Sequence, residues 1–160
     1  YFKNLKAQGE IGRAKITQIT RYGTVLLATI QGYGLDPTHV GGLTMGADPI
    51  AYAIAHVSAL EGWIIDGFSV RKSAKDHGTG QRIEGGLPKN ARALMVEDTM
   101  TTGLSTLKAI DVVRAYGAEI LGVITLVNRS EDAAALYNAQ GLPLISLYTG
   151  TELLEAAQSS

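Results

Sequence analysis

A chain of 160 residues, 46% of them hydrophobic and 18% charged, is long enough for one domain with a buried core and is too apolar for a disordered chain. Its formal net charge of −1 provides no global basic field for nucleic acid, and the absence of cysteine excludes disulfides, thiolate metal sites and cysteine nucleophiles. No apolar run approaches the roughly 18 residues of a membrane span, and there is no signal-peptide pattern. We therefore expect a soluble cytoplasmic protein with neither a membrane nor a nucleic-acid partner. Because the first residue is Tyr1 rather than Met, we expect a native N-terminus that is processed or lies upstream.

Helical and strand patterns alternate along the first half of the chain. Isoleucine and leucine spacing predicts a helix over residues 10–30, and a short strand over residues 39–43 ends in glycines. Asp48 and Pro49 suit the first turn of a helix over residues 47–60, and an apolar strand follows over residues 63–70.

A polar stretch separates these elements from the second half of the chain. Residues 71–88 contain glycines and show no periodicity, which predicts a long loop or a loose hairpin. The elements predicted after it are strands over residues 92–96, 119–127 and 142–147 and helices over residues 104–116, 131–139 and 151–157.

This alternation predicts an α/β fold, with a Rossmann-like parallel sheet flanked by helices. Ligands of such sheets bind beyond the carboxyl ends of the strands. We therefore expect the functional residues in the loops that follow residues 43, 70, 96 and 127.

The segment of residues 93–105 has the features of a ribose phosphate site. An apolar strand leads to two adjacent acids, Glu97 and Asp98, which we predict at the strand end, and a Thr-, Gly- and Ser-rich turn then opens a helix. Unpaired N–H groups and the helix dipole favour an anion there, while Gly103 permits close approach of the backbone. Carboxylates beside a phosphate site suit sugar hydroxyls. Helix caps and solvated acids would explain each fragment singly, but the complete order is more specific.

Residues 97–105 resemble the 5-phosphoribosyl-1-pyrophosphate (PRPP) signature of type I phosphoribosyltransferases. The resemblance implies the fold of that family, with Glu97 and Asp98 on the ribose 2- and 3-hydroxyls. It also implies Mg²⁺ held through the pyrophosphate and the ribose, with Asp98 as a candidate ligand and no site made by protein alone. The further residues that the resemblance assigns to PRPP are Thr99, Thr101, Thr102, Gly103, Leu104 and Ser105.

Residues 71–82 contain four fixed cations, a histidine and two glycines within twelve positions. A charge run is usually solvated surface, but a dense basic cluster in a glycine-bearing loop beside a phosphate site favours a lid over a polyanion.

The order Arg71-Lys72-x-Ala74-Lys75-Asp76-His77-Gly78 in this segment resembles that of the orotate phosphoribosyltransferases. The resemblance implies that Arg71 and Lys72 bind pyrophosphate. It also implies that Lys75, Asp76 and His77 are catalytic, on a flexible loop that reaches the neighbouring subunit's site in a homodimer.

Two further loops complete the expected site. Residues 41–49 match the pyrophosphate loop of the family, but Thr44 and Met45 stand where many members place an aromatic residue and a lysine. We expect the Thr44 hydroxyl and backbone N–H groups to bind pyrophosphate, although a tight turn selected for packing also explains Leu43 and Met45. Arg129 follows the strand over residues 119–127, and the resemblance assigns it, with Thr101, to orotate.

We therefore predict a single phosphoribosyltransferase domain over residues 1–160, with a PRPP-binding core over residues 39–153. Residues 1–38 are predicted to hold the first helix and the remnant of an incomplete N-terminal hood. The implied function is transfer of the 5-phosphoribosyl group from PRPP to orotate, giving orotidine 5′-phosphate and pyrophosphate in pyrimidine (UMP) biosynthesis. The alternatives are a phosphoribosyltransferase for another base, a PRPP-binding regulatory protein, and an inactive member of the family.

Overall fold

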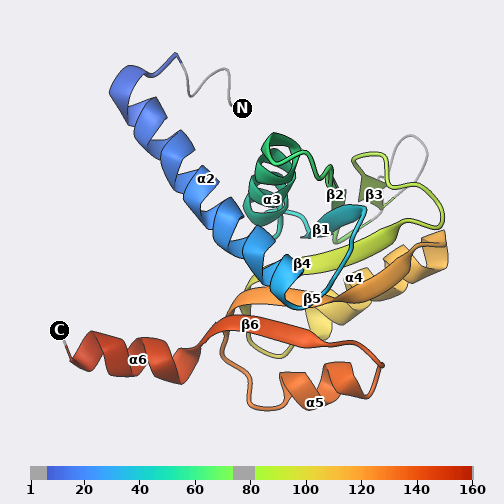
Figure 1. Cartoon of the computed structure of the whole chain (residues 1–160). Helices are drawn as coiled ribbons and strands as arrows, with labels where there is room; N and C mark the ends of the chain where they lie inside the picture. Colours follow the sequence, from blue (N-terminus) through green and yellow to red (C-terminus); the bar gives the residue numbers. More distant parts are fainter. Residues whose placement is uncertain (1–6, 74–81, 160) are drawn as a thin grey trace.

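The computed structural model of the protein describes residues 7–73 and 82–159. The elements of this part of the chain, labelled in Figure 1, are α2 (Gly9–Gly32), β1 (His39–Leu43), α3 (Asp48–Leu60), β2 (Asp66–Val70), β3 (Ile83–Glu84), β4 (Arg92–Met100), α4 (Leu104–Tyr116), β5 (Glu119–Asn128), α5 (Ala133–Asn138), β6 (Leu144–Thr149) and α6 (Gly150–Gln158). Among the described residues, no helix has both the length and the apolar character needed to cross a membrane.

The strands form one sheet in the order β3-β2-β1-β4-β5-β6. Neighbouring strands from β2 to β6 are parallel, which confirms the predicted α/β architecture. The edge strand β3 is antiparallel to β2, and Val70 pairs with Ile83 across the two strands. Val70 ends the predicted second strand, whereas Ile83 lies within the segment of residues 71–88 that we predicted as a long loop or loose hairpin. A strand of two residues is too short to leave a periodic signal.

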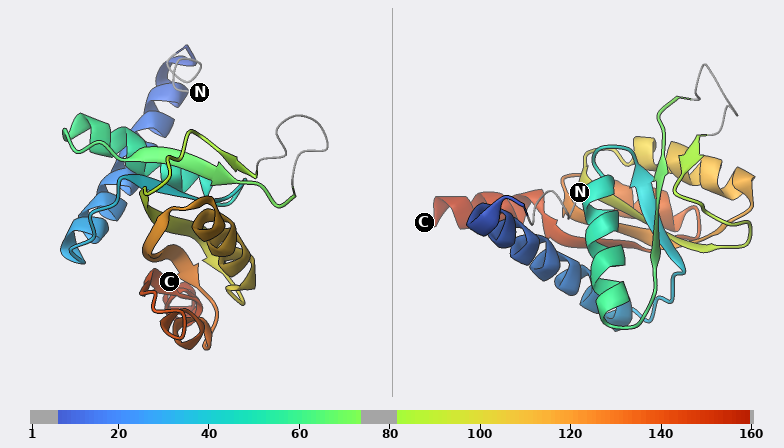
Figure 2. Two further views of the ribbon diagram at one scale, coloured as in Figure 1. Left: turned by 90° about the vertical axis from the view of Figure 1, so that its right-hand side faces the viewer. Right: turned by 90° about the horizontal axis from the view of Figure 1, so that it is seen from above.

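Helices cover both faces of the sheet (Figure 2), and the central strands are apolar on both sides for that reason. One face is packed by α2 and α3, which contact Leu94 and Val96 of β4. The other is packed by α4 and α5, with Ala93 and Met95 of the same strand in that cluster. The alternation of these four residues is the period of two expected for a strand.

Strand β4 is longer than predicted. We expected it to end at Val96, before the acid pair, but it continues to Met100 because Thr99 and Met100 pair with Val127 and Asn128 of β5. The acids therefore lie within the strand rather than after it. A prediction based on hydrophobicity misses the exposed end of this strand because its side chains are polar. The backbone forms its hydrogen bonds to β5 regardless of side-chain polarity.

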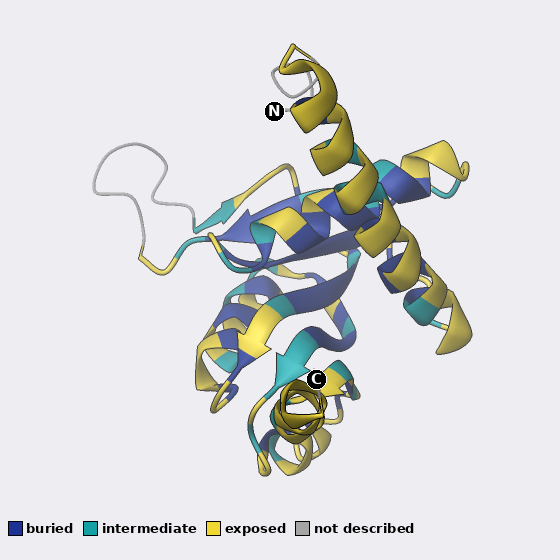
Figure 3. Ribbon diagram, turned by 90° about the vertical axis from the view of Figure 1, so that its left-hand side faces the viewer, coloured by how far each residue is buried: buried dark blue, intermediate teal, exposed yellow. Residues whose placement is uncertain are grey.

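The other differences from the predicted elements are shifts of boundaries. The second strand begins at Asp66 instead of residue 63, and β6 lies two residues later than expected. Helix α5 is shorter than its predicted range, whereas α6 is one residue longer at each end. A capping box starts α6, in which Thr149 accepts from the Glu152 N–H at 3.2 Å. None of the nine residues of α6, all of them described, is buried, and the helix extends away from the sheet (Figures 1 and 3).

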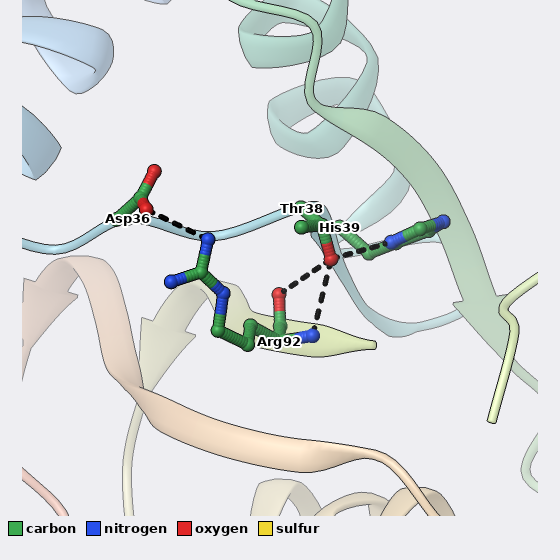
Figure 4. A network of polar contacts seen from close by, with 4 residues as sticks. All are labelled: Asp36, Thr38, His39 and Arg92. Atoms are coloured by element: carbon green, nitrogen blue, oxygen red, sulfur yellow. Dashed lines mark hydrogen bonds and ion pairs between the residues drawn. The ribbon is translucent and has the colours of Figure 1, made fainter. Parts of the chain in front are cut away.

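A polar network joins the amino ends of β1 and β4, at the edge of the sheet opposite the predicted site (Figure 4). The Thr38 hydroxyl accepts from the Arg92 N–H at 3.1 Å, and the Arg92 guanidinium donates to Asp36 at 2.7 Å. His39 Nδ1 lies 3.0 Å from the same hydroxyl. Burial lowers the pKa of His39 and the charge of Asp66 opposes this effect, so the environment on balance favours the neutral imidazole.

Candidate functional site

A cavity of about 260 Å³ opens at the carboxyl ends of β1 and β4. This is the place where a parallel sheet with this connectivity is expected to bind ligands. Its lining comes from the β1–α3 loop, the start of the basic segment, the end of β4 and the start of α4: Leu43, Thr44, Met45, Gly46, Lys72, Glu97, Asp98, Thr99, Met100, Thr101, Thr102, Gly103, Ser105 and Thr106.

The two acids of β4 converge on one wall of this cavity. Thr106 Oγ1 donates to Glu97 Oε2 at 2.8 Å, and Asp98 Oδ1 accepts from the Thr99 N–H at 2.6 Å. A Cβ on Gly46 would lie 3.0 Å from oxygens of both carboxylates, so the β1–α3 loop passes directly against the pair. Acceptor oxygens grouped in this way suit the hydroxyls of a diol or an oxygen-binding cation.

The surroundings of Glu97 change the pKa of its carboxyl group. Burial raises the pKa of the Glu97 carboxyl, the hydrogen bond from Thr106 lowers it, and the neighbouring Asp98 raises it further. The charged form of Glu97 is therefore incompletely compensated by the protein. Hydroxyl donors or a cation bound at the pair would supply the missing compensation.

The start of α4 leaves backbone donors for an anion. Gly103 is the N-cap, with a φ of 74°, and no side chain caps the helix there. The Leu104 N–H donates only a long bond of 3.4 Å to Thr102 Oγ1. The helix has 13 residues, and its dipole places partial positive charge at this end. The first turn therefore offers uncapped N–H donors in a field that favours an anion.

The described parts of the basic segment form its two ends. Lys72 lines the cavity, whereas the Arg71 side chain pairs with Glu84 at 2.9 Å and does not line it. The Arg82 guanidinium donates to the backbone carbonyls of Arg71 and Lys72 at 3.0 and 3.1 Å. These bonds hold the two ends together beside the cavity. The predicted catalytic residues lie outside the described residues: Lys75, Asp76 and His77.

The β1–α3 loop contributes Thr44 and Met45 to the cavity. Met45 has a left-handed φ of 80°, which is costly for a residue with a side chain. Asp48 holds this conformation, because its Oδ2 accepts from the Met45 N–H at 3.0 Å and its Oδ1 accepts from Ser69 Oγ at 2.7 Å. One carboxylate thus joins the loop to the strand that leads into the basic segment.

Replacing Asp48 by asparagine is therefore expected to lower the melting temperature. An amide cannot accept at both positions, and hydrogen bonds to a charged group contribute about 1.5–3 kcal/mol. In a chain of this size the loss corresponds to a decrease of about 3–10 °C. Thermal unfolding of Asp48→Asn beside Asp111→Asn, an exposed position on α4, measures it. Equal melting temperatures for the two variants would contradict the role of Asp48.

Like Arg71, two further predicted site residues, Leu104 and Arg129, do not line this cavity with their side chains. Leu104 is exposed, and only its backbone faces the turn. Arg129 lies at the end of β5, where its N–H donates to the Met100 carbonyl at 2.8 Å. It lines a neighbouring hollow with Val127, Asn128, Ser130, Glu131, Thr149, Gly150, Thr151, Leu153 and Leu154.

The structure also brings in residues that the sequence did not indicate. Thr106 is buried against Glu97, and Met100 lines the cavity from the last position of β4. Tyr137 donates from α5 to the Gly103 carbonyl across 34 residues of sequence. Thr106 could have been identified from the sequence, because a helical projection that starts at Gly103 places this residue on the side that faces the strand. Nothing in the local sequence links Tyr137 to the turn.

Comparison with known proteins gives the same assignment along most of the chain. The phosphoribosyl transferase domain family matches residues 15–140. The orotate phosphoribosyltransferase of Aquifex aeolicus is 47% identical over 119 residues, and that of Streptomyces avermitilis is 50% identical over 120 residues. Each alignment covers 74% of this chain, and the chain spans 65% and 66% of the length of the two relatives.

Among solved structures, the chain is similar to Mycobacterium tuberculosis H37Rv orotate phosphoribosyltransferase in complex with PRPP. The TM-score is 0.72 at 40% sequence identity, over 84% of this chain and 75% of that chain. The fold is therefore that of the type I phosphoribosyltransferases, as the signature over residues 97–105 predicted. The chain belongs to the phosphoribosyltransferase family, within its orotate phosphoribosyltransferase branch.

Proposed function

We propose that the protein transfers the 5-phosphoribosyl group from PRPP to orotate, giving orotidine 5′-phosphate and pyrophosphate, a step of de novo pyrimidine (UMP) biosynthesis. The observation that carries this proposal is a cavity lined both by the carboxylate pair and by the uncapped start of α4. The pair offers acceptors for a diol and the helix start offers donors for a phosphate, which together match a ribose phosphate.

PRPP in this proposal spans the cavity from α4 to the β1–α3 loop. Glu97 and Asp98 accept from the ribose hydroxyls. Thr44 and Lys72, which line the cavity, take the pyrophosphate. Arg71 is proposed to join them by exchanging its partner Glu84 for the pyrophosphate. The 5-phosphate lies against the turn formed by Thr101, Thr102, Gly103, Leu104 and Ser105, with Thr99 beside it.

Orotate is proposed to bind next to the ribose, in contact with Thr101 and Arg129. Thr101 lines the PRPP cavity, and Arg129 lines the adjoining hollow at the end of β5. The Arg129 N–H to Met100 carbonyl bond places this arginine next to the strand that carries the acids. A guanidinium suits the orotate carboxylate because the two planar groups can form paired hydrogen bonds.

The chemistry needs charge stabilisation around the leaving pyrophosphate. Cleavage of the anomeric C–O bond places positive charge on the ribose and negative charge on the leaving group, which fixed cations stabilise. Lys75 and His77 are the proposed catalytic cations with Asp76 beside them, and His77 is suited to donate a proton near neutral pH. Ionised orotate is itself the nucleophile, so the protein supplies binding, orientation and charge.

The acid pair also fits Mg²⁺. Asp98 is exposed toward the cavity, and carboxylate oxygens are ligands that Mg²⁺ accepts. The described residues contain no group of three or more candidate metal ligands. We propose an ion held mainly through substrate oxygens. When bound, the ion would neutralise charge on the pyrophosphate.

The remaining parts of the proposal concern organisation. We propose a homodimer with shared active sites, in which the segment bearing Lys75 reaches the partner's cavity. We also propose a cytoplasmic location and a single domain over residues 1–160, with its PRPP-binding core over residues 39–153.

Ultraviolet absorbance of orotate tests this function directly. Orotate should disappear when protein, PRPP and Mg²⁺ are all present and remain when PRPP is omitted. If orotate persists in the complete mixture while adenine or uracil is consumed, the substrate is that other base and not orotate. Persistence with no base consumed would reject the catalytic function.

Lys72→Ala is expected to raise the KM for PRPP about tenfold. Lys72 lines the cavity next to the proposed pyrophosphate position, and loss of one charge-assisted hydrogen bond of about 1.4 kcal/mol corresponds to that factor. The matched control is Lys108→Ala on the exposed face of α4. Initial rates at varied PRPP measure both variants, and an unchanged KM in Lys72→Ala would remove Lys72 from the site.

A further inference from the structure

A tyrosine hydroxyl reaches the phosphate turn through the apolar core. Tyr137 of α5 is fully buried in the cluster that also contains Met100, Ala109 and Leu142. Its Oη donates to the Gly103 carbonyl at 2.8 Å. A phenylalanine would fill this space as well, so the position of the hydroxyl needs a separate explanation.

The hydrogen bond determines how the peptide between Gly103 and Leu104 is oriented. The Gly103 carbonyl accepts from Tyr137 and also from the Leu107 N–H at 3.1 Å. In a trans peptide the N–H points opposite to the carbonyl. The Leu104 N–H is therefore directed away from the core, toward Thr102, whose side chain lines the cavity.

The ring of Tyr137 also sets the position of the turn. A Cβ on Gly103 would lie 3.0 Å from the ring edge, so the backbone of the turn rests on the aromatic ring. Burial raises the pKa of the Tyr137 phenol to about 12. The hydroxyl consequently remains protonated, and remains a donor, throughout the neutral range.

We propose that Tyr137 is a positioning residue for the 5-phosphate: its hydroxyl fixes the Gly103–Leu104 peptide so that the Leu104 N–H is presented to the anion. The proposal rests on the function proposed above. If the hydrogen bond were purely structural, its loss would lower stability without selectively lowering the affinity for the 5-phosphate part of the substrate. A positioning role predicts that selective loss of affinity.

Two parts of PRPP serve as separate probes in calorimetry on the full chain. Tyr137→Phe keeps the ring and leaves the Gly103 carbonyl bonded to the Leu107 N–H. We expect it to bind ribose 5-phosphate about tenfold more weakly than the unsubstituted protein does, which corresponds to 1.4 kcal/mol. Its affinity for pyrophosphate should be unchanged, because that group is assigned to the β1–α3 loop and the basic segment.

The matched control is Tyr116→Phe, which removes a hydroxyl from a residue packed against the same core cluster at the other end of α4. It should leave both affinities unchanged, and thermal unfolding shows whether each variant is folded. Equal ribose 5-phosphate affinity in Tyr137→Phe and the unsubstituted protein would overturn the proposal. Parallel weakening of both ligands would overturn it too, in favour of a general loosening. Failure of the unsubstituted protein to bind ribose 5-phosphate would overturn the proposed function and this inference with it.

Discussion

Gly103→Ala is expected to weaken PRPP binding by about a hundredfold or more. An alanine at a φ of 74° costs about 1–2 kcal/mol, and its Cβ would lie 3.0 Å from the Tyr137 ring. That ring is fixed in the core, so the turn has to move instead. A shift of the turn misaligns several N–H donors at once, and a loss of about 2.7 kcal/mol corresponds to a hundredfold change in Kd.

The same helix supplies the control for this substitution. Gly117, at the carboxyl end of α4, also has a left-handed φ, of 108°, but a Cβ there would meet only the Lys89 side chain at 3.7 Å. Gly117→Ala should therefore lower the melting temperature through backbone strain and leave PRPP affinity intact. Calorimetry with both variants separates the two effects. Equal PRPP affinity in Gly103→Ala and Gly117→Ala would contradict the assignment of the turn to the phosphate.

Glu97→Gln is expected to weaken PRPP binding about tenfold to a hundredfold while raising thermal stability near neutral pH. The affinity falls because an amide is a weaker acceptor for a ribose hydroxyl than a carboxylate, and hydrogen bonds to charged groups contribute about 1.5–3 kcal/mol. The stability rises because the carboxylate is partly buried beside Asp98. Glutamine retains an oxygen that can accept from Thr106.

The pH dependence of this gain has a definite sign. Burial raises the pKa of Glu97 in the folded chain above its ordinary value of 4.5. The folded state therefore binds the Glu97 proton more tightly than the unfolded state does. The stability that this proton contributes to the unsubstituted protein is fully present below the unfolded pKa and is lost as the pH rises through the folded pKa. The excess melting temperature of Glu97→Gln should be larger at about pH 8 than at about pH 4. Melting curves at both values measure it, with Glu119→Gln, an exposed position on β5, as the control. A gain that shrinks as the pH rises would contradict the assigned pKa direction.

The sequence predicts the parallel core well because buried strands are apolar on both faces. The first strand was predicted with its observed bounds, His39–Leu43, as was the helix Leu104–Tyr116. The end of β4 was not predicted, since Glu97 and Asp98 resemble a loop in composition and only the pairing with β5 shows that they extend the strand. Strand β3 was missed because two residues have no period.

The candidate site was predictable where its chemistry is local in sequence. Glu97, Asp98 and Gly103 lie within seven positions, and their order carries both the physical argument and the resemblance. The partners that hold them are distant or unmarked. Tyr137 reaches the turn from α5. Asp48, which accepts from the Met45 N–H of the β1–α3 loop, is itself bonded by Ser69 of β2, 21 residues away. Such contacts follow from the packing of helices on the sheet, which no local pattern records.

Whether this cavity binds PRPP is measured by calorimetry, in which PRPP is titrated in the presence of Mg²⁺ into the unsubstituted protein and into the double variant Glu97→Gln, Gly103→Ala. We expect saturable binding of one PRPP per chain, competed by ribose 5-phosphate, and no measurable binding in the folded double variant. Undiminished PRPP binding in that variant, or no binding by the unsubstituted protein, would show that the cavity between β1, β4 and α4 is not the PRPP site.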